Sequence, residues 1–309
     1  MKNDAADLAD QKQNKRGNRS QQRPDARLLK LFAQSAVSAR SAASFSNVIG
    51  LSAAIVARQA SPYVCCVRID ELMIDARFPL HWQMSRPERL AIVAVLEQIK
   101  PRVSIEIGTY EGGSLQVISA YSEKVFSLDL DAAVATRLAG RFSNVEFLSG
   151  DSRIVLPDLV SRLNASGETP EFVLIDGSHY TEGVRSDIES LLLLKPTRDV
   201  VILMHDSFNP NCRKAMREAA WADCPYVHEV ELDLIPGNFS AEKFDTAELG
   251  SMWSGLGCAI LSPTPRTGPL VIREWQREVF EAVLPISRHA APQTETVAGR
   301  IKRALRTIG

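Results

Sequence analysis

The sequence predicts an α/β protein built around a doubly wound, mostly parallel sheet. Short apolar stretches alternate with helical stretches from residue 103 to residue 221, which is typical of a parallel sheet covered by helices on both faces. The first apolar stretch runs directly into a glycine-rich turn, and the second ends in acidic residues, as in nucleoside-binding sheets of this kind. With 309 residues, 45% of them hydrophobic, the chain is long enough to bury such a core.

A helix is expected before the first strand, from about Arg86 to Ile99. Ser85 and Glu88 have the spacing of a capping box, in which the serine hydroxyl accepts the amide of the glutamate and the glutamate reaches back. Apolar residues follow at helical spacing: Leu90, Val93 and Leu96. We expect this face of the helix to pack on the sheet.

The first strand and its turn, residues 103–114, read VSIEIGTYEGGS and are the most informative part of the chain. Gly108, Gly112 and Gly113 permit unusual backbone conformations and let a ligand approach the backbone closely. The spacing Glu106-x-Gly108-x-x-x-Gly112 differs from the G-x-G-x-x-G fingerprint that binds pyrophosphate. We therefore expect the turn to hold an adenosyl group without phosphates. An ordinary strand-to-helix turn is the alternative.

The second strand, Lys124–Asp131, ends in two aspartates. Asp129 follows the glycine turn by about 20 residues, where such sheets place a carboxylate that binds ribose hydroxyls. Asp131 is the alternative for this role, and a solvated charge at the strand end is a third interpretation. A third strand and its turn follow at Asn144–Asp151.

The alternation of strands and helices continues along the chain. We expect strands near Glu171–Ile175 and Asp199–Met204, helices near Glu182–Leu194 and Arg213–Trp221, and final strands at Val227–Leu234 and Cys258–Leu261. The insertion between the final strands, residues 235–257, is too long for a simple hairpin turn. Because it contains Phe239, Phe244 and Trp253, we expect it to close over a bound substrate.

Two further strands end in titratable residues. They read FVLIDGSHY at residues 172–180 and VILMHDS at residues 201–207. Because ligands bind outside the carboxyl ends of the strands in open α/β sheets, we expect the polar side chains there to converge: Asp176, His179, His205 and Asp206. Two carboxylates from neighbouring strands suit a hard divalent cation such as Mg²⁺. The alternatives are that Asp176 caps the next helix and that His179 is a structural histidine.

In these motifs the chain resembles the class I S-adenosylmethionine-dependent methyltransferases, whose first motif is E/D-x-G-x-x-x-G. The resemblance covers roughly residues 82–263. It implies a seven-stranded Rossmann-like sheet in which the last strand is antiparallel and lies beside the fifth, and it implies that Asp151 and Ser152 flank the adenine. The residues that it implies for S-adenosylmethionine binding are Glu106, Gly108, Thr109, Tyr110, Gly112, Gly113, Ser114, Asp129, Asp151, Ser152 and Asp176.

The fourth and fifth strands are similar to those of the metal-dependent O-methyltransferases that act on macrolide sugars, aminocoumarin sugars and catechol-type diols. That branch also contains cephalosporin-hydroxylase-like proteins. Its D-x-x-H motif matches Asp176 and His179, which implies a metal-binding aspartate and a histidine that serves as general base. The branch has Glu-Asp where this chain has His205-Asp206. The resemblance thus implies Asp176, His205 and Asp206 as ligands of Mg²⁺ or Mn²⁺, and the histidine favours softer ions such as Mn²⁺, Fe²⁺ or Zn²⁺.

The expected function is therefore methyl transfer from S-adenosylmethionine to a hydroxyl oxygen of a saccharide or small metabolite, with help from a divalent metal. A metal-independent methyltransferase is one alternative. A second is a non-catalytic binding protein that keeps the fold, since fold does not fix function. A nicotinamide-dependent oxidoreductase would use a similar sheet, but the absence of G-x-G-x-x-G counts against it.

Composition limits the partners and the location. A formal net charge of −1 gives no electrostatic footprint for nucleic acid. The five cysteines form no C-x-x-C pair, and their odd number argues against a disulfide framework, so we expect a cytoplasmic protein. No uncharged run is long and apolar enough to span a bilayer. A homo-oligomer is compatible with the sequence.

Four segments are expected along the chain. Residues 1–26 are too polar to bury a core and predict a disordered tail. Residues 27–84 predict a helical extension, residues 85–265 the cofactor-binding domain, and residues 266–309 a helical C-terminal segment. Within the last segment, Val297–Ile308 has an amphipathic pattern with basic residues. It is expected to pack on the domain, and an anionic membrane surface is the alternative.

Overall fold

The computed structural model describes residues 77–240 and 249–289. The predicted tail at residues 1–26, most of the predicted extension at 27–84 and the basic segment Val297–Ile308 lie outside the described residues, as does Phe244. All described residues belong to one compact unit.

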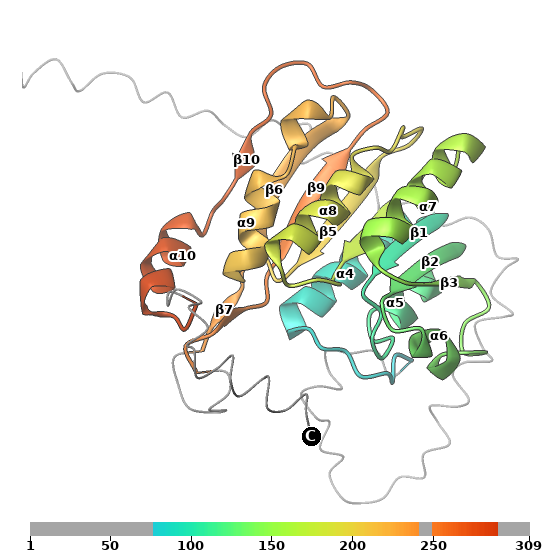
Figure 1. Ribbon diagram of the computed structural model, residues 1–309, viewed down its shortest axis with the longest axis horizontal. Coiled ribbons are helices and arrows are strands. Elements are labelled where there is room, and N and C mark those ends of the chain that lie inside the picture. Colours follow the sequence, from blue (N-terminus) through green and yellow to red (C-terminus); the bar gives the residue numbers. More distant parts are fainter. Residues whose placement is uncertain (1–76, 241–248, 290–309) are drawn as a thin grey trace, which may run out of the picture. The chain divides into compact units, whose positions relative to one another are not determined.

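A single eight-stranded sheet forms the centre of this unit, with the strand order β10-β6-β9-β5-β4-β1-β2-β3 (Figure 1). Its strands are β1 (Val103–Ile107), β2 (Lys124–Asp129), β3 (Val145–Ser149), β4 (Phe172–Ile175), β5 (Val200–His205), β6 (Val227–Ile235), β9 (Leu256–Leu261) and β10 (Ile272–Arg273). Strand β9 is antiparallel to both β5 and β6, and the other pairings are parallel. The α/β fold and the antiparallel strand beside the fifth are confirmed.

The sheet has one strand more than the seven that we expected. The additional strand, β10, pairs with β6 through only two residues, Ile272 and Arg273. A two-residue strand leaves no alternating pattern in the sequence, so residue periodicity cannot reveal it.

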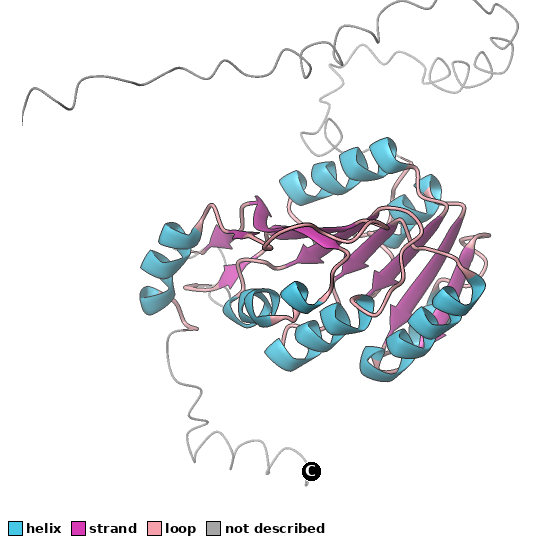
Figure 2. Ribbon diagram, turned by 90° about the horizontal axis from the view of Figure 1, so that it is seen from above, coloured by secondary structure: helices cyan, strands magenta, loops and turns pink. Residues whose placement is uncertain are grey.

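Helices cover both faces of the sheet (Figure 2). One face packs against α4 (Arg86–Ile99), α5 (Leu115–Tyr121) and α6 (Ala133–Arg137), and the other against α7 (Ser152–Ser166), α8 (Thr181–Leu191) and α9 (Pro210–Glu218). Every residue of β1 and β4 is buried. Continuous burial explains why β4 is wholly apolar and why β1 is apolar except for Ser104 and Glu106, as is usual for strands covered on both faces.

The helix α4 begins and ends where the sequence predicts, and its capping box is present. The prediction for its packing face is partly wrong, because Leu90 is 42% exposed while Ile92 and Leu96 are fully buried. Within the described residues, no helix is both long and apolar enough to cross a membrane.

Short elements complete the described chain. A two-stranded sheet of β7 (Asn238–Phe239) and β8 (Met252–Trp253) precedes β9. The 3₁₀ turns η3 (Trp221–Asp223) and η4 (Leu284–Ile286) and the helix α10 (Arg277–Val283) make up the rest. The helix α10 is anchored by Arg213 and Arg217 of α9, which both bind Glu274, and by Phe280, which packs on Phe208. Backbone hydrogen bonds from Ser207 and Phe208 to the carbonyls of Gly255 and Ser254 place the turn after β8 next to the carboxyl end of β5.

Candidate active site

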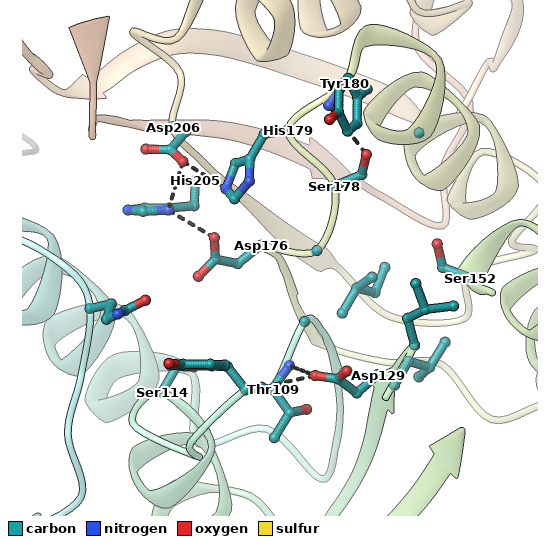
Figure 3. A pocket seen from close by; sticks show the side chains of 18 of the residues that line it. Thr109, Ser114, Asp129, Ser152, Asp176, Ser178, His179, Tyr180, His205 and Asp206 are labelled. Atoms are coloured by element: carbon teal, nitrogen blue, oxygen red, sulfur yellow. Dashed lines mark hydrogen bonds and ion pairs between the residues drawn. The ribbon is translucent and has the colours of Figure 1, made fainter. Parts of the chain in front are cut away.

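A cavity of about 1010 Å³ lies at the carboxyl ends of the parallel strands (Figure 3). Most of the residues that the sequence predicts for the site line it: Gly108, Thr109, Tyr110, Gly113, Ser114, Asp129, Asp151, Ser152, Asp176, His179, His205 and Asp206. Glu106 and Gly112 do not line it. The prediction that these segments converge at one sheet edge agrees with this geometry.

Glu106 does not line the cavity, but its side chain is bonded to the glycine turn that does. Its side chain is fully buried and accepts hydrogen bonds from Ser114 Oγ at 2.5 Å and from Thr109 Oγ1 at 2.9 Å. Burial raises the pKa of the Glu106 carboxyl to about 8. In this structure Glu106 therefore fixes the shape of the loop and contacts the cavity only through its partners.

The glycines of the first motif are required by the protein's own backbone. Gly108 has φ +90°, and a Cβ there would lie 2.2 Å from the carbonyl oxygen of Asp176. At Gly113 a Cβ would lie 2.2 Å from the carbonyl oxygen of His81. Neighbouring protein segments thus account for these glycines, and their role in the approach of a ligand stays a prediction.

Asp129 organises the same turn from the end of β2. Its Oδ2 accepts the backbone N–H groups of Thr109 at 3.0 Å and Tyr110 at 2.9 Å, and its Oδ1 accepts that of Asp131 at 2.8 Å. A carboxylate has about four acceptor positions, so Asp129 can still accept a hydrogen bond from a ligand. Asp131, the alternative candidate, pairs instead with Arg137 at 2.8 Å and does not line the cavity.

The end of β3 supplies the third segment of the cavity wall. Asp151 is the N-cap of α7, where its side chain accepts the backbone N–H of Arg153. It also pairs with the Arg153 guanidinium at 2.5 Å. Asp151 and Ser152 line the cavity together with Leu128 and Leu130, so this end offers apolar surface beside polar groups.

Three side chains that are able to hold a metal ion gather on the opposite side of the cavity. Asp176 follows β4, His179 lies in the loop before α8, and Asp206 follows β5 (Figure 3). One potential ligand atom from each lies within 4.8 Å of the other two. Two carboxylate oxygens and an imidazole nitrogen are donors that Mn²⁺, Fe²⁺ and Zn²⁺ accept, and Mg²⁺ is suited mainly by the two carboxylates.

Asp206 and His179 contact each other directly. His179 Nε2 lies 3.0 Å from Asp206 Oδ2, while Asp206 Oδ1 accepts the backbone N–H of Ser254 at 2.7 Å. The Asp206 carboxylate raises the pKa of His179. Burial acts to raise the pKa of Asp206, but the His179 and His205 side chains outweigh it, so that this pKa is lowered.

His205 lies behind this group, with both ring nitrogens directed at carboxylates. Nδ1 is 2.8 Å from Asp176 Oδ1 and 3.6 Å from Asp206 Oδ2, and Nε2 is 3.2 Å from Glu88 Oε1. Burial opposes the charged imidazole, yet the nearby carboxylates, Asp176 first among them, hold the pKa of His205 well above its usual value. The structure groups His179, rather than the predicted His205, with the two aspartates; a ligand role for His205 stays a prediction.

Several residues that line the cavity were missed by sequence reasoning. His81, Trp82 and Gln83 precede α4. Asn238 begins β7, Ser240 follows β7 and Ser254 follows β8. No spacing signal distinguishes these residues, because each reaches the cavity through long-range packing. The sequence spacing identifies Glu88 only as a capping residue.

The insertion expected to cover the site is represented by β7 and β8. Trp253 lines the cavity, and its ring meets that of His179 edge-on at a centroid distance of 5.4 Å. Phe239 instead packs against the apolar cluster of Phe208, Met252 and Phe280. The expected closure over a substrate stays a prediction, since residues 241–248 lie outside the described residues.

Residues 105–207 match a family model described as a methyltransferase domain. No curated protein matches the chain by sequence.

Solved structures that are similar to the chain include three with low sequence identity. The cofactor-bound protein Rv0187 from MTB is 17% identical over 78% of this chain and 99% of its own, with a TM-score of 0.42. An O-methyltransferase from Bacillus cereus in complex with SAH is 13% identical over 76% and 97%, with a TM-score of 0.42. The O-methyltransferase TomG from Streptomyces achromogenes, in complex with SAM, is 16% identical over 59% and 82%, also with a TM-score of 0.42.

Proposed function

We propose that the protein is an S-adenosylmethionine-dependent O-methyltransferase, because residues 105–207 match a family model described as a methyltransferase domain. The proposed acceptor is a hydroxyl group of a saccharide or small metabolite. The observation that carries the proposal is the gathering of Asp176, His179 and Asp206 on one side of the cavity that the glycine turn and Asp129 line.

The cavity fits the cofactor in size and in chemistry. Pockets for small molecules usually enclose about 300–1,000 Å³, and this one is about 1010 Å³, which leaves room for an acceptor beside the cofactor. Leu128 and Leu130 offer an apolar surface to the adenine, and Asp129 offers acceptor positions to the ribose hydroxyls. The cofactor's place is thus supported at the end of the cavity opposite Asp206.

The donor set also fits a divalent cation, which we propose is held by the carboxylates of Asp176 and Asp206. When bound, such an ion would lower the pKa of an acceptor hydroxyl. The buried surroundings support this assignment: Asp206 and Glu88 are almost fully buried, and buried carboxylates need positive charge nearby. The imidazoles of His179 and His205 lie beside these carboxylates, and a divalent cation would add further positive charge to the same group.

In the proposed reaction, the acceptor oxygen attacks the methyl carbon of the sulfonium. The new carbon–oxygen bond forms as the carbon–sulfur bond breaks, which leaves S-adenosylhomocysteine and the methylated acceptor. His179 accepts the hydroxyl proton, and Asp206 orients its ring through the 3.0 Å contact. A base in such a position typically contributes about 10²- to 10⁴-fold to the rate.

A second arrangement is favoured by the distances among the three side chains. Because the ligand atom of His179 belongs to the same 4.8 Å group as those of Asp176 and Asp206, His179 would serve there as a third ligand. A measurement of Mn²⁺ binding distinguishes the role of His179 as a base from its role as a metal ligand. As the base alone, His179 is dispensable for Mn²⁺ affinity, whereas as a ligand its replacement by alanine weakens Mn²⁺ binding strongly.

The experiment that tests the function is a calorimetric titration of the full chain with S-adenosylhomocysteine, with and without Mn²⁺, followed by mass spectrometry of acceptor mixtures incubated with S-adenosylmethionine. Micromolar binding and an acceptor that gains the mass of one methylene group support the proposal. Turnover that persists in the presence of EDTA identifies a metal-independent enzyme. Binding without turnover on saccharides, phenols and alcohols supports a non-catalytic protein, and no binding at all overturns the proposal.

The domain bounds and the location remain proposals as well. The elements from α4 at Arg86 to β9 at Leu261 pack around one sheet, which supports a methyltransferase domain at residues 85–265, and the cavity-lining residues His81, Trp82 and Gln83 extend its start by a few positions. Among the described residues, Cys212, Cys224 and Cys258 are free thiols. Free thiols suit a reducing compartment and thus support the cytoplasm.

A further inference from the structure

Glu88 is a fully buried carboxylate at the start of α4, outside every motif that the proposed reaction uses. In an ordinary capping box the glutamate reaches back to the N-cap amide at the helix end. Glu88 does so, since its Oε2 accepts the backbone N–H of Ser85 at 2.6 Å. That contact occupies only one of its two oxygens.

The second oxygen of Glu88 is directed at the candidate active site. Oε1 accepts the backbone N–H of Gly255 at 2.5 Å and lies 3.2 Å from Nε2 of His205. Gly255 is 167 positions from Glu88 along the chain. Helix capping alone therefore does not account for the position of this side chain.

Each of these partners lies next to one of the two carboxylates of the site. His205 contacts Asp176, because its Nδ1 lies 2.8 Å from Asp176 Oδ1. Ser254, the residue before Gly255, donates its backbone N–H to Asp206 Oδ1 at 2.7 Å. The buried Glu88 side chain thus contacts His205, which binds Asp176, and the Ser254–Gly255 turn, which binds Asp206.

The contacts of Glu88 require a carboxylate. Two backbone N–H groups and an imidazole nitrogen converge on its two oxygens. A glutamine could satisfy Ser85 with its carbonyl oxygen, but its NH₂ group would then face the Gly255 N–H, which is also a donor. An unsatisfied buried donor is costly, so the Ser254–Gly255 turn and the His205 ring would shift.

We infer that Glu88 is a positioning residue for the proposed methyl-transfer site, acting through His205 on Asp176 and through the Ser254–Gly255 turn on Asp206. That the site transfers a methyl group rests on the proposed function. That Glu88 positions the site rests on its contacts with Gly255 and His205. Replacing a residue that orients a metal ligand without touching the metal itself typically weakens metal binding by about 10- to 100-fold.

The test compares two variants of the full chain, Glu88→Gln and Ser85→Ala. Ser85→Ala removes the hydroxyl half of the capping box and leaves the carboxylate of Glu88 with its contacts to Gly255 and His205. Both variants are expected to lower the melting temperature. Only Glu88→Gln is expected to weaken binding of Mn²⁺, followed by electron paramagnetic resonance, by about tenfold or more, while S-adenosylhomocysteine affinity stays within about twofold in both.

A second readout does not depend on a metal. The imidazole ¹⁵N signals of His205 and His179 are recorded in the ¹⁵N-histidine-labelled chain and assigned with His205→Asn and His179→Ala. Both sets of signals are expected to move in Glu88→Gln and to stay in place in Ser85→Ala. Unchanged signals in folded Glu88→Gln overturn the inference.

The outcomes separate the inference from the proposed function. If the wild-type chain binds no Mn²⁺, the proposed cation fails, and the imidazole signals alone decide the role of Glu88. If Glu88→Gln does not fold, Glu88→Asp takes its place, because it keeps the buried charge and withdraws it from Gly255 and His205 by one methylene group. Equal effects of the Glu88 variant and Ser85→Ala on both readouts would assign Glu88 to helix capping alone.

Discussion

His179 Nε2 lies 3.0 Å from Oδ2 of Asp206, a residue whose own backbone is left-handed with φ +57°. A non-glycine residue in this region is strained by about 1–3 kcal/mol and persists only where its surroundings impose it. Here the Asp206 carbonyl accepts the backbone N–H of Asn209 and the Asp206 side chain accepts that of Ser254. The fold therefore imposes the orientation that brings Asp206 to His179.

The first prediction concerns this pair. His179→Ala is expected to lower kcat by about 10²- to 10⁴-fold, because the proposed proton acceptor is lost, while the Kd for S-adenosylhomocysteine changes by less than about twofold. Steady-state kinetics and calorimetry measure the two effects. His228→Ala serves as the control, since His228 lies outside the cavity and contacts the Thr264 carbonyl. Parallel loss of kcat and cofactor affinity would assign His179 a structural role.

The second prediction separates two aspartates of one loop. Asp129→Ala is expected to raise the Kd for S-adenosylhomocysteine by roughly 10- to 100-fold, as hydrogen bonds to a charged group are worth about 1.5–3 kcal/mol. The loss has two sources, because Asp129 also holds the amides of Thr109 and Tyr110. Asp131→Ala is the matched control and should leave the Kd within about twofold. Calorimetry measures both Kd values. A larger increase in Kd for Asp131→Ala than for Asp129→Ala would identify Asp131 as the residue that binds the ribose.

The fold was predictable from the sequence because its strands are buried on both faces. Every residue of β1 and β4 is buried. The strand β4 therefore appears as an unbroken apolar run, and in β1 only Ser104 and Glu106 interrupt the apolar residues. The errors have local causes. Leu90 continues the helical apolar pattern yet stays 42% exposed, and β10 is too short to produce a pattern.

The candidate site was predictable only where it follows strand ends. Asp176 and Asp206 directly follow the adjacent strands β4 and β5, and adjacent parallel strands bring their carboxyl ends together. Glu88 and Gly255 reach the same place through the packing of α4 and the turn before β9. Their separation of 167 positions along the chain has no counterpart in local spacing.

The third prediction tests the backbone role of Gly108. Gly108→Ala places a Cβ 2.2 Å from the Asp176 carbonyl oxygen at φ +90°. Gly167→Ala is matched to it, because Gly167 has φ +72° but no atom within 4 Å of the point where a Cβ would lie. The control is expected to lose about 1–2 kcal/mol of unfolding free energy from strain alone. Gly108→Ala should lose at least about 1–3 kcal/mol more, and equal losses in urea denaturation would show that the Asp176 backbone moves freely.

The fourth prediction follows from the buried carboxyl of Glu106, whose pKa burial raises from 4.5 to about 8. Between those values the folded chain binds a proton that the unfolded chain has released, so stability falls as pH rises through this window and levels off above it. The slope from this group is at most about 1.4 kcal/mol per pH unit. The glutamine of Glu106→Gln cannot ionise. The free energy of unfolding of this variant in urea should therefore fall less steeply between about pH 5 and pH 8, and its slope should differ from that of the wild type by up to roughly 1.4 kcal/mol per pH unit. Glu189→Gln, at an exposed position of α8, is the control and should keep the wild-type slope. A Glu106→Gln slope equal to that of the wild type would mean that Glu106 is ionised in the folded protein, with Ser114 and Thr109 stabilising its charge.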